Sequence, residues 1–496
     1  MQEEPVTITG FAGIYDGRTS DLITSWDEHP QWKKSFEATN VNVEMTCVAS
    51  SAYGDAFALM AAANDSYDFV EFASRYYTGG FEKMIEDGFS IDLAEYMNDY
   101  YMPDYVAAIE AVDGMKDVYT DSGIVGCYYQ ISEATTTGGM MIRQDWLDAL
   151  KLDVPTTIDE LSDVLAAFKN EYNPRETLLV DACGAINDNH IVGSYDIALY
   201  TSPITSAYAQ FIQRDGTVYS SFTEDGFDDY ITQMADWYQK GYFTSDFLGN
   251  ADFNSNEYKA HAYNGDSGVF CFRTDNIPYL KTDSTDEGAV YTPMADPVLK
   301  AGDKFFYSNK TKSSLSESIT VTTFCENPEA VACWINYWFT EEGKNSYWGE
   351  EGETYTVNAD GSKQFTDFVF HDETYPTNVI TYSIMNPKYG WETIERKMAA
   401  YEDPADVLAA IDVWESNIGE EDHQLPTWIS LTAEESTEFS STYSDISTLC
   451  NQYVVGLITG DIPLGEIDSF QETLKDMGID RCVSILQDSL DRYNAR

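Results

Sequence analysis

The stretch VNVEMTCVASSAYGDAFALMAAANDSYDFVEFA, residues 41–73, decides the fold class. Residues 41–49 predict a strand, the following DAFALMAAAN predicts a helix, and YDFVEFA (residues 67–73) predicts another strand. This last strand is apolar in character throughout, as the strands of parallel sheets are. A strand, a helix and a strand in succession are typical of an α/β fold.

Strands and loops of the same kind extend to both sides of this stretch. Residues 6–10 predict an earlier strand, and the polar, aromatic segment FAGIYDGRTSDLITSWDEHPQW (residues 11–32) follows it as a loop at a cleft. Residues 123–131 predict a further strand. A strand rich in Met and Ile then leads into a short helix through Trp146 and Leu150, which Pro155 ends.

Helix signals are strong in the rest of the chain. Thr157 and Glu160 form a capping box before apolar residues at helical spacing. Pro328 begins a helix with one apolar face, and we expect Gly343 to end it. The chain closes with two helices separated by Gly478.

Length and composition indicate a large globular protein. With 496 residues, the chain exceeds what one hydrophobic core usually serves, so we expect two lobes. It is 43% hydrophobic and 14% aromatic, with 35 Tyr and 10 Trp, which argues against intrinsic disorder. These rings suit core packing, and a sugar-binding cleft would use the same residue types.

The chain is strongly acidic along its whole length. It carries 85 acidic and 28 basic residues, a formal net charge of −57. This charge repels phosphate backbones and anionic lipids, so we expect no nucleic-acid partner and no peripheral membrane binding. A solvated acidic surface and selection of a cationic ligand both account for the charge, which alone does not separate them.

Cysteine and histidine spacing gives no sign of a metal centre. The eight cysteines include no Cys-x-x-Cys pair and no cluster with His at zinc-ligand spacing, so we expect no metal and no cofactor. Cys325 and Cys333 lie near enough in sequence for a local disulfide. Free, buried thiols are nevertheless our expectation.

No stretch approaches the roughly 18 apolar residues that span a membrane. The opening MQEEPVTITG also lacks the charged and apolar regions of a leader. If the protein is exported, we expect its leader and a lipid-bearing cysteine to be absent from this sequence.

Catalytic motifs are not found in the sequence. It has no nucleophile elbow, Walker loop, His-Glu-x-x-His motif or dinucleotide fingerprint, and its five histidines are isolated from one another. We therefore predict a protein with no catalytic residues. Paired carboxylates for glycoside hydrolysis remain an alternative, because so many acids make every pairing possible.

Three segments in this order resemble the family of extracellular solute-binding proteins of ABC transporters. They are MIRQDWLDALKLDVPTTIDELSDVLAAFK (residues 141–169), WINYWFTEEGKNSYWGEEGETYTVNADG (residues 334–361) and MGIDRCVSILQDSLDRYNA (residues 477–495). With the weaker DGFSIDLAEYM (residues 87–97), the resemblance spans nearly the whole chain. It is to the larger, lipoprotein-type oligosaccharide binders of family 1, found in Firmicutes.

The resemblance implies a two-lobed, periplasmic-binding-protein-like α/β fold with the ligand held between the lobes. By analogy with smaller members of the family, we place the chain crossings near residues 132, 298 and 345. The N-terminal lobe then comprises residues 6–132 and 298–345, and the C-terminal lobe comprises residues 133–297 and 346–496. Closure about a hinge would bury the ligand and form the surface that a membrane permease reads.

One departure from the family concerns calcium. Many relatives carry a calcium loop directly after the helix that corresponds to residues 157–169, but this chain reads NEYNPRETLLVD there. Alternating acids and the turn glycine are missing, so the loop does not supply the six or more oxygens that calcium needs. Residues 181–189, DACGAINDN, offer another group of oxygens, but we predict no metal.

Candidate ligand-binding residues lie at the ends of predicted strands, in the loops and turns between them and at the predicted chain crossings, in segments that combine aromatic and polar side chains. A sugar needs flat apolar faces together with hydrogen-bonding groups, because a buried hydroxyl without a partner is costly. The candidates are Asp16, Arg18, Arg75, Tyr76, Tyr77, Tyr129, Gln130, Phe272, Arg273, Trp348 and Trp391. Each has a structural alternative: the aromatic rings can belong to the core and the arginines to ion pairs.

The acidic charge disfavours uronate oligomers, so we predict a neutral oligosaccharide as ligand. A peptide or polyamine is the alternative. The expected partners are this ligand and the permease subunits of an ABC transporter. We expect a monomer tethered by a lipid anchor to the extracellular face of the membrane.

Overall fold

The strand, helix and strand expected from residues 41–73 are all present, and they flank the first strand of the chain. β2 (Val41–Ala49), α2 (Tyr53–Ala63) and β3 (Phe69–Glu71) follow one another, and both strands run parallel to β1 (Val6–Ile14).

In this computed structural model the described residues are 2–14, 19, 22–179, 190–199, 208–245, 247, 256–307, 314–385 and 387–496.

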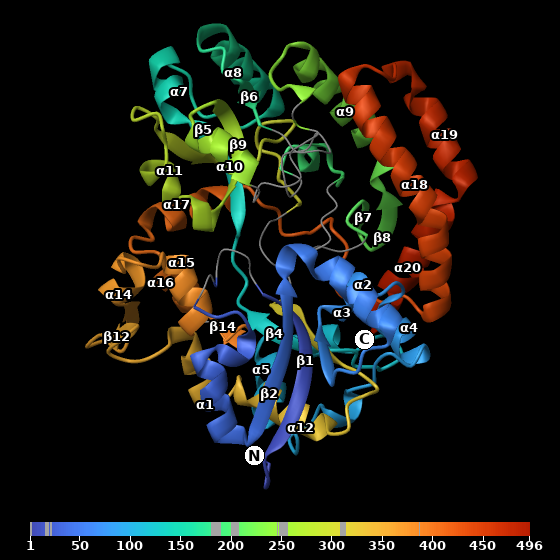
Figure 1. The fold of residues 1–496 in the computed structure, drawn as a ribbon. Helices are drawn as coiled ribbons and strands as arrows, with labels where there is room; N and C mark the ends of the chain where they lie inside the picture. The colour runs from blue at the N-terminus through green and yellow to red at the C-terminus, as the bar shows by residue number, and fades with distance from the viewer. Residues whose placement is uncertain are drawn as a thin grey trace.

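The first lobe is built on a sheet with helices on both faces (Figure 1). Among the described residues it has six strands in the order β14-β4-β11-β3-β1-β2, where β4 is Tyr128–Ser132, β11 is Leu315–Val321 and β14 is Trp391–Glu392. Successive β1 residues belong to different cores. Ala12 is part of the core that includes residues of α1 (Pro30–Thr39), α5 (Pro103–Ala111) and α12 (Pro328–Tyr337), and Phe11 is part of the core that includes residues of α2.

The second lobe is built on a smaller sheet. Its described strands follow the order β10-β5-β9-β6, where β5 is Gly138–Arg143, β6 is Glu176–Leu178, β9 is Ser267–Arg273 and β10 is Tyr291–Met294. One face carries α7 (Gln144–Leu150), α8 (Ile158–Glu171) and α9 (Asp225–Gln239); the other carries α10 (Asn256–Tyr263) and α17 (Ala405–Trp414). A close approach fixes α17, because a Cβ on Gly139 would lie 2.4 Å from the Trp414 ring.

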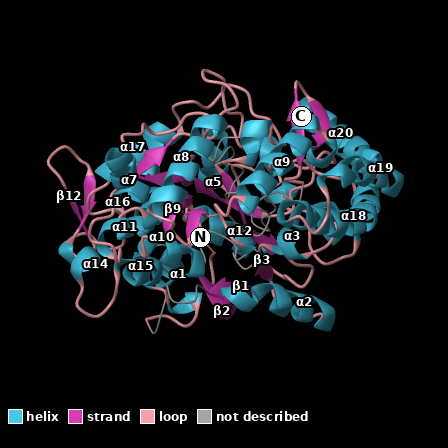
Figure 2. Ribbon diagram, turned by 90° about the horizontal axis from the view of Figure 1, so that it is seen from above, coloured by secondary structure: helices cyan, strands magenta, loops and turns pink. Residues whose placement is uncertain are grey.

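The C-terminal helices extend the second lobe on one side. α18 (Ala433–Thr459), α19 (Ile467–Met477) and α20 (Ile479–Ala495) pack beside α9. They lie on the opposite side of the molecule from β12 (Tyr355–Val357) and α14 (Asp367–His371) (Figure 2). The predicted separation of the last two helices is confirmed, since Gly478 has a φ of 101°. At the tip of α20, Arg492 and Arg496 both bind Asp121 of the first lobe.

The chain passes between the sheets more than once. It leaves β4 for β5 between Ser132 and Gly138, and it returns between Met294 and Leu315. Beyond the lobe boundary predicted near residue 345, β14 still pairs with β4 in the first sheet, with Trp391 opposite Ile131. The chain enters the second lobe for the second time after β14, and there α17 joins its core.

Residues 346–390 form what we call the side module. It contains β12 (Tyr355–Val357), β13 (Lys363–Phe365), α14 (Asp367–His371), α15 (Thr377–Ile380) and the π-helical turn η9 (Thr381–Met385). Its own small core includes Trp348, Phe365 and Met385. Figure 1 shows this module beside the first lobe, at the level of the gap between the two sheets.

Two helix predictions have different outcomes. The capping box of Thr157 and Glu160 is confirmed at the start of α8. The prediction that Gly343 ends the helix after Pro328 is wrong: α12 ends at Tyr337, and Gly343 lies inside α13 (Glu341–Asn345). Glycine is required there by packing, because a Cβ would lie 2.0 Å from the Tyr337 carbonyl oxygen.

The described cysteines are all free, including Cys325 and Cys333. Burial raises the pKa of the Cys325 thiol to about 12. In the described part of the chain, every helix is too short or too polar to cross a membrane.

Candidate functional site

The carboxyl ends of the parallel strands in the first sheet meet at one edge. β1 runs parallel to β2 and β3, and β14 runs parallel to β4. β11 is antiparallel to both β3 and β4, so β4 also runs in the direction of β1. Since β4 leads from its carboxyl end into β5, this edge faces the second lobe (Figure 1). Ligands of open α/β sheets gather at such edges.

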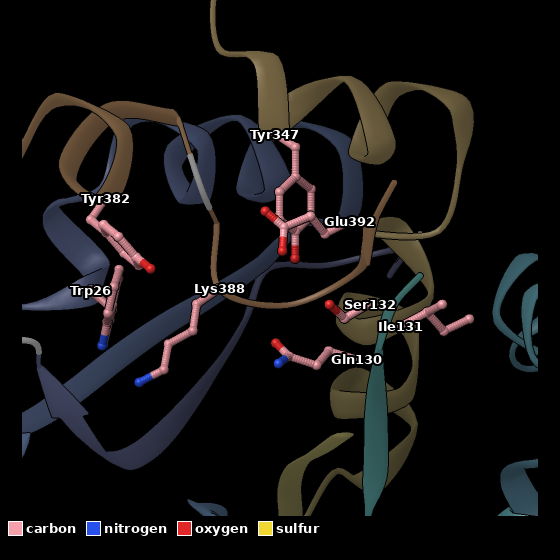
Figure 3. A pocket seen from close by; sticks show the side chains of 8 residues that line it. All are labelled: Trp26, Gln130, Ile131, Ser132, Tyr347, Tyr382, Lys388 and Glu392. Atoms are coloured by element: carbon pink, nitrogen blue, oxygen red, sulfur yellow. The ribbon is translucent and has the colours of Figure 1, made fainter. Parts of the chain in front are cut away.

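A cavity of about 130 Å³ lies at this edge, between the first sheet and the side module. Its walls combine aromatic rings with polar groups, and they are Trp26, Gln130, Ile131, Ser132, Tyr347, Tyr382, Lys388 and Glu392. Figure 3 shows Trp26 and Tyr382 on one side, Gln130 and Ser132 on the other, and Lys388 between them. The cavity therefore offers both the flat faces and the hydrogen-bonding groups that a sugar requires.

Lys388 is a cation in the cavity wall, and a buried carboxylate neutralises it. Its Nζ lies 2.7 Å from Oε2 of Glu71, the last residue of β3, and donates to the Gly13 carbonyl oxygen at 2.7 Å. The Gly13 N–H and the Tyr389 hydroxyl also donate to the Glu71 carboxylate, at 3.1 and 3.3 Å. Burial, and then the nearby Glu71 charge, raise the pKa of Tyr389 well above its usual range.

The same contacts hold the aromatic wall in place. The indole N–H of Trp26 donates to the Gly13 carbonyl oxygen at 2.9 Å, and Lys388 Nζ lies 4.7 Å from its ring centroid. Gly13 of β1 is thus the common acceptor for the aromatic wall and the cation. The wall is fixed because the strand end, the ring and the ammonium group share one hydrogen-bond network.

Two further cations near the cavity, among the residues that the structure describes, also face carboxylates. Arg396 Nη1 lies 3.9 Å from Oε1 of Glu392, and Arg396 Nε donates to the Tyr347 carbonyl oxygen at 2.9 Å. Lys397 donates to the Glu133 carbonyl oxygen and lies near the Glu133 and Glu392 carboxylates. Burial lowers the pKa of Lys397. Lys388, Arg396 and Lys397 are therefore all matched by negative charge.

The family of this protein is shown by comparison with known protein families. The family described as "Bacterial extracellular solute-binding protein" matches residues 31–369, more than half of the chain. The chain belongs to this family.

Solved structures share the fold of this solute-binding protein over its whole length. An HMO-binding, ABC-transporter-associated solute-binding protein from Bifidobacterium longum infantis covers 99% of this chain and 99% of its own, with a TM-score of 0.78 and 16% identity. FusA of S. pneumoniae, in complex with kestose, covers 99% of this chain and 100% of its own, with a TM-score of 0.74 and 16% identity.

A curated relative matches a shorter region. The polygalacturonan/rhamnogalacturonan-binding protein of Bacillus subtilis is 29% identical over 134 residues. The match spans 27% of this chain and only 26% of that relative's length.

The predicted site residues of this solute-binding protein lie in different places in the structure. Gln130 lines the cavity. Arg273 ends β9, next to the start of β5, and binds Asp275 at 3.1 Å. Asp16 and Arg18 lie outside the described residues.

The candidates that follow β3 are held by contacts within the first lobe. The Arg75 guanidinium lies 4.2 Å from the Phe72 ring centroid. Tyr76 is 42% exposed and packs against Tyr53, at 5.3 Å between ring centroids. The Tyr77 hydroxyl donates to Asp87 at 2.8 Å.

Tyr129, Phe272 and Trp348, three of the residues predicted to contact the ligand, are buried in this structure. Their exposed fractions are 2%, 0% and 5%, and each belongs to a hydrophobic core. The fourth aromatic candidate, Trp391, is half-buried, and its indole N–H donates to Glu133 at 3.2 Å. These rings pack the protein and do not line the cavity.

Most of the cavity residues were not among the predicted site residues, although all but Tyr382 lie in or next to segments that were selected from the sequence. Trp26 lies in the loop of residues 11–32, and Lys388 and Glu392 lie in the turn that contains Trp391. Tyr347 directly precedes Trp348. The available signal was a clustering of aromatic and polar residues, which marks a segment without marking its inward-facing members.

Metal-binding groups are not found in the described part of the chain. There, no three His, Cys, Asp or Glu side chains come close enough to hold an ion. The alternative cluster at residues 181–189 lies outside the described residues.

Proposed function

We propose that this protein captures a neutral oligosaccharide between its lobes and delivers it to the permease of an ABC importer. The cavity at the facing edge of the first sheet carries this proposal, because it combines aromatic faces with uncharged hydrogen-bonding groups. The names of the relatives point the same way, since one was solved with kestose and another is described as HMO-binding.

The charges around the cavity favour a neutral ligand. A uronate needs a cation that is not already neutralised, but Lys388 faces Glu71 and Arg396 faces Glu392. A polyamine needs carboxylates that are not already matched. The acidic polymers in the name of the Bacillus subtilis relative therefore fit this cavity less well than neutral sugars do.

The remaining features of the proposal follow the family. The protein acts as a monomer, held at the extracellular face of the membrane by a lipid anchor. It performs no chemistry on the sugar: closure of the lobes buries the ligand and creates the surface for the permease.

A thermal-shift screen of neutral oligosaccharides, uronate oligomers, peptides and polyamines tests the ligand class. A ligand at 100 times its Kd stabilises the folded protein by about 2.7 kcal/mol, which is a readily measured shift. We expect stabilisation by neutral oligosaccharides. Stabilisation by peptides or polyamines alone, or turnover of any oligosaccharide, would contradict the proposal.

The Gln130→Ala variant tests the cavity itself. Loss of one hydrogen bond of about 1 kcal/mol weakens binding of the best neutral oligosaccharide by about five- to tenfold. Gln144→Ala is the matched control, because Gln144 binds Asp148 on α7, outside the cavity. Equal affinities of the two variants would remove this cavity from the binding site.

A further inference from the structure

Lys388 occupies a backbone conformation that its side chain does not favour. Its φ is 73°, in the left-handed region that L side chains rarely adopt. Strained residues persist where surrounding contacts hold them, and they cluster at functional sites. Here the strain places an ammonium group in the wall of the candidate sugar cavity, beside Trp26.

This ammonium group is bound from behind by Glu71. Glu71 is 0% exposed, and its carboxylate takes hydrogen bonds from Lys388 Nζ, Gly13 N–H and Tyr389 Oη. Glu71 therefore contacts no ligand in the cavity. Its negative charge cancels that of Lys388 at close range, where a buried pair is screened little by salt.

An acidic sugar and a neutral sugar experience this pair differently. A uronate carboxylate that approaches Lys388 also approaches Glu71, so it gains little attraction and loses its hydration. A neutral hydroxyl loses only an ordinary hydrogen bond to water, and the polar side chains of Gln130 and Ser132 line the same cavity. The pair of Lys388 and Glu71 thus leaves hydrogen bonding between the cavity and neutral sugars intact, and it removes the attraction of the cavity wall for acidic sugars.

Resting on the proposed function, we infer that Glu71 determines the charge specificity of this solute-binding protein. By neutralising Lys388 at the cavity wall, it excludes uronate oligosaccharides and leaves neutral ones as ligands. Glu71 is a positioning residue, because it acts on the ligand only through Lys388.

The Glu71→Gln variant tests this inference with trigalacturonate as the probe. Glutamine keeps the size of the side chain and removes its charge, so Lys388 becomes available to a carboxylate. We expect at least a tenfold gain in trigalacturonate affinity over the wild-type protein, measured by calorimetry at low salt.

Two further variants separate this effect from a structural change. In the double variant Glu71→Gln/Lys388→Gln the gain should disappear, since the cation is gone. Asp406→Asn, which removes a carboxylate from the exposed Lys281 pair, is the control and should gain nothing. If Glu71→Gln does not fold, Glu71→Asp keeps the buried charge but withdraws it from Lys388, and a smaller gain is expected.

The inference is overturned if the wild-type protein binds trigalacturonate as tightly as it binds neutral oligosaccharides. It is also overturned if folded Glu71→Gln or Glu71→Asp gains no affinity for trigalacturonate. Failure of every neutral oligosaccharide to bind the wild-type protein would contradict the proposed function instead, because the gain for Glu71→Gln is scored with trigalacturonate alone.

Discussion

Each lobe buries a histidine ring, and the two surroundings shift the pKa in opposite directions. In the first lobe, His29 is 0% exposed beside the cavity residue Trp26, and burial lowers its pKa to about 3. In the second lobe, burial also lowers the pKa of His190, but the Asp296 carboxylate bonded to its Nδ1 outweighs this and raises it well above 6.5.

The comparison shows that the partner of a buried group decides its charge in this protein. The Nδ1 atom of His29 accepts a hydrogen bond from the Gln31 N–H at 3.2 Å, and its Nε2 has no partner among the described residues. A neutral ring is the stable form there. A carboxylate beside His190 instead favours the imidazolium. At the cavity, Lys388 is likewise a buried cation beside a carboxylate, that of Glu71.

The largest effect is expected when a buried pair loses its carboxylate. Glu71→Ala removes the carboxylate that neutralises Lys388 and accepts from the Gly13 N–H, so the free energy of unfolding should fall by about 3–5 kcal/mol. Denaturant titration measures this change. A loss below about 1 kcal/mol would show that the pair is not buried in solution.

A smaller effect, visible only in acid, is expected at His29. The unfolded ring takes up a proton near pH 6.5 but the folded ring only near pH 3, so acid favours unfolding between these values. Relative to His29→Asn, which keeps an acceptor at this position, the wild-type protein should lose about 2–3 kcal/mol between pH 7 and 4.5.

Unfolding of both proteins across this pH range measures the difference. His371→Asn is the control, because His371 is 56% exposed and binds only Glu402 among the described contacts. Parallel pH profiles for wild-type protein and His29→Asn would contradict the burial of a neutral ring.

His190 should give a smaller dependence of the opposite sign. Its folded-state pKa is raised, so its stabilisation is complete below pH 6.5 and is lost as the pH rises through the folded-state value. His190→Gln should therefore cost more stability at pH 6 than at pH 9. The amide can still donate to Asp296, which keeps the cost moderate. An equal cost at both pH values would argue against a charged ring.

The smallest effect is expected for an exposed pair. Lys281 and Asp406 are 74% and 58% exposed, so Asp406→Ala should change the free energy of unfolding by less than about 1 kcal/mol. Asp406→Ala, measured by the same denaturant titration, is the control for Glu71→Ala. A loss as large as that of Glu71→Ala would mean that burial does not separate these pairs.

Secondary structure was predictable wherever a local pattern was strong. The strand, helix and strand of residues 41–73, the capping box at Thr157 and the break at Gly478 each depend on neighbouring residues only. The antiparallel strand β11 and the pairing of β14 with β4 were not foreseen. These pairings join residues far apart in sequence, so no local pattern encodes them.

The sequence by itself determined that the protein is a large, acidic α/β chain, and it indicated most of the segments that build the cavity, but not the turn that carries Tyr382. Only the tertiary structure decided which residue of each segment faces inward: Gln130 and not Tyr129, Tyr347 and not Trp348, Glu392 and not Trp391. Neighbouring residues point in opposite directions in the strands β4 and β14, and in different directions in the helical turn of residues 346–348. A shift by one position therefore exchanges a cavity wall for a packing contact.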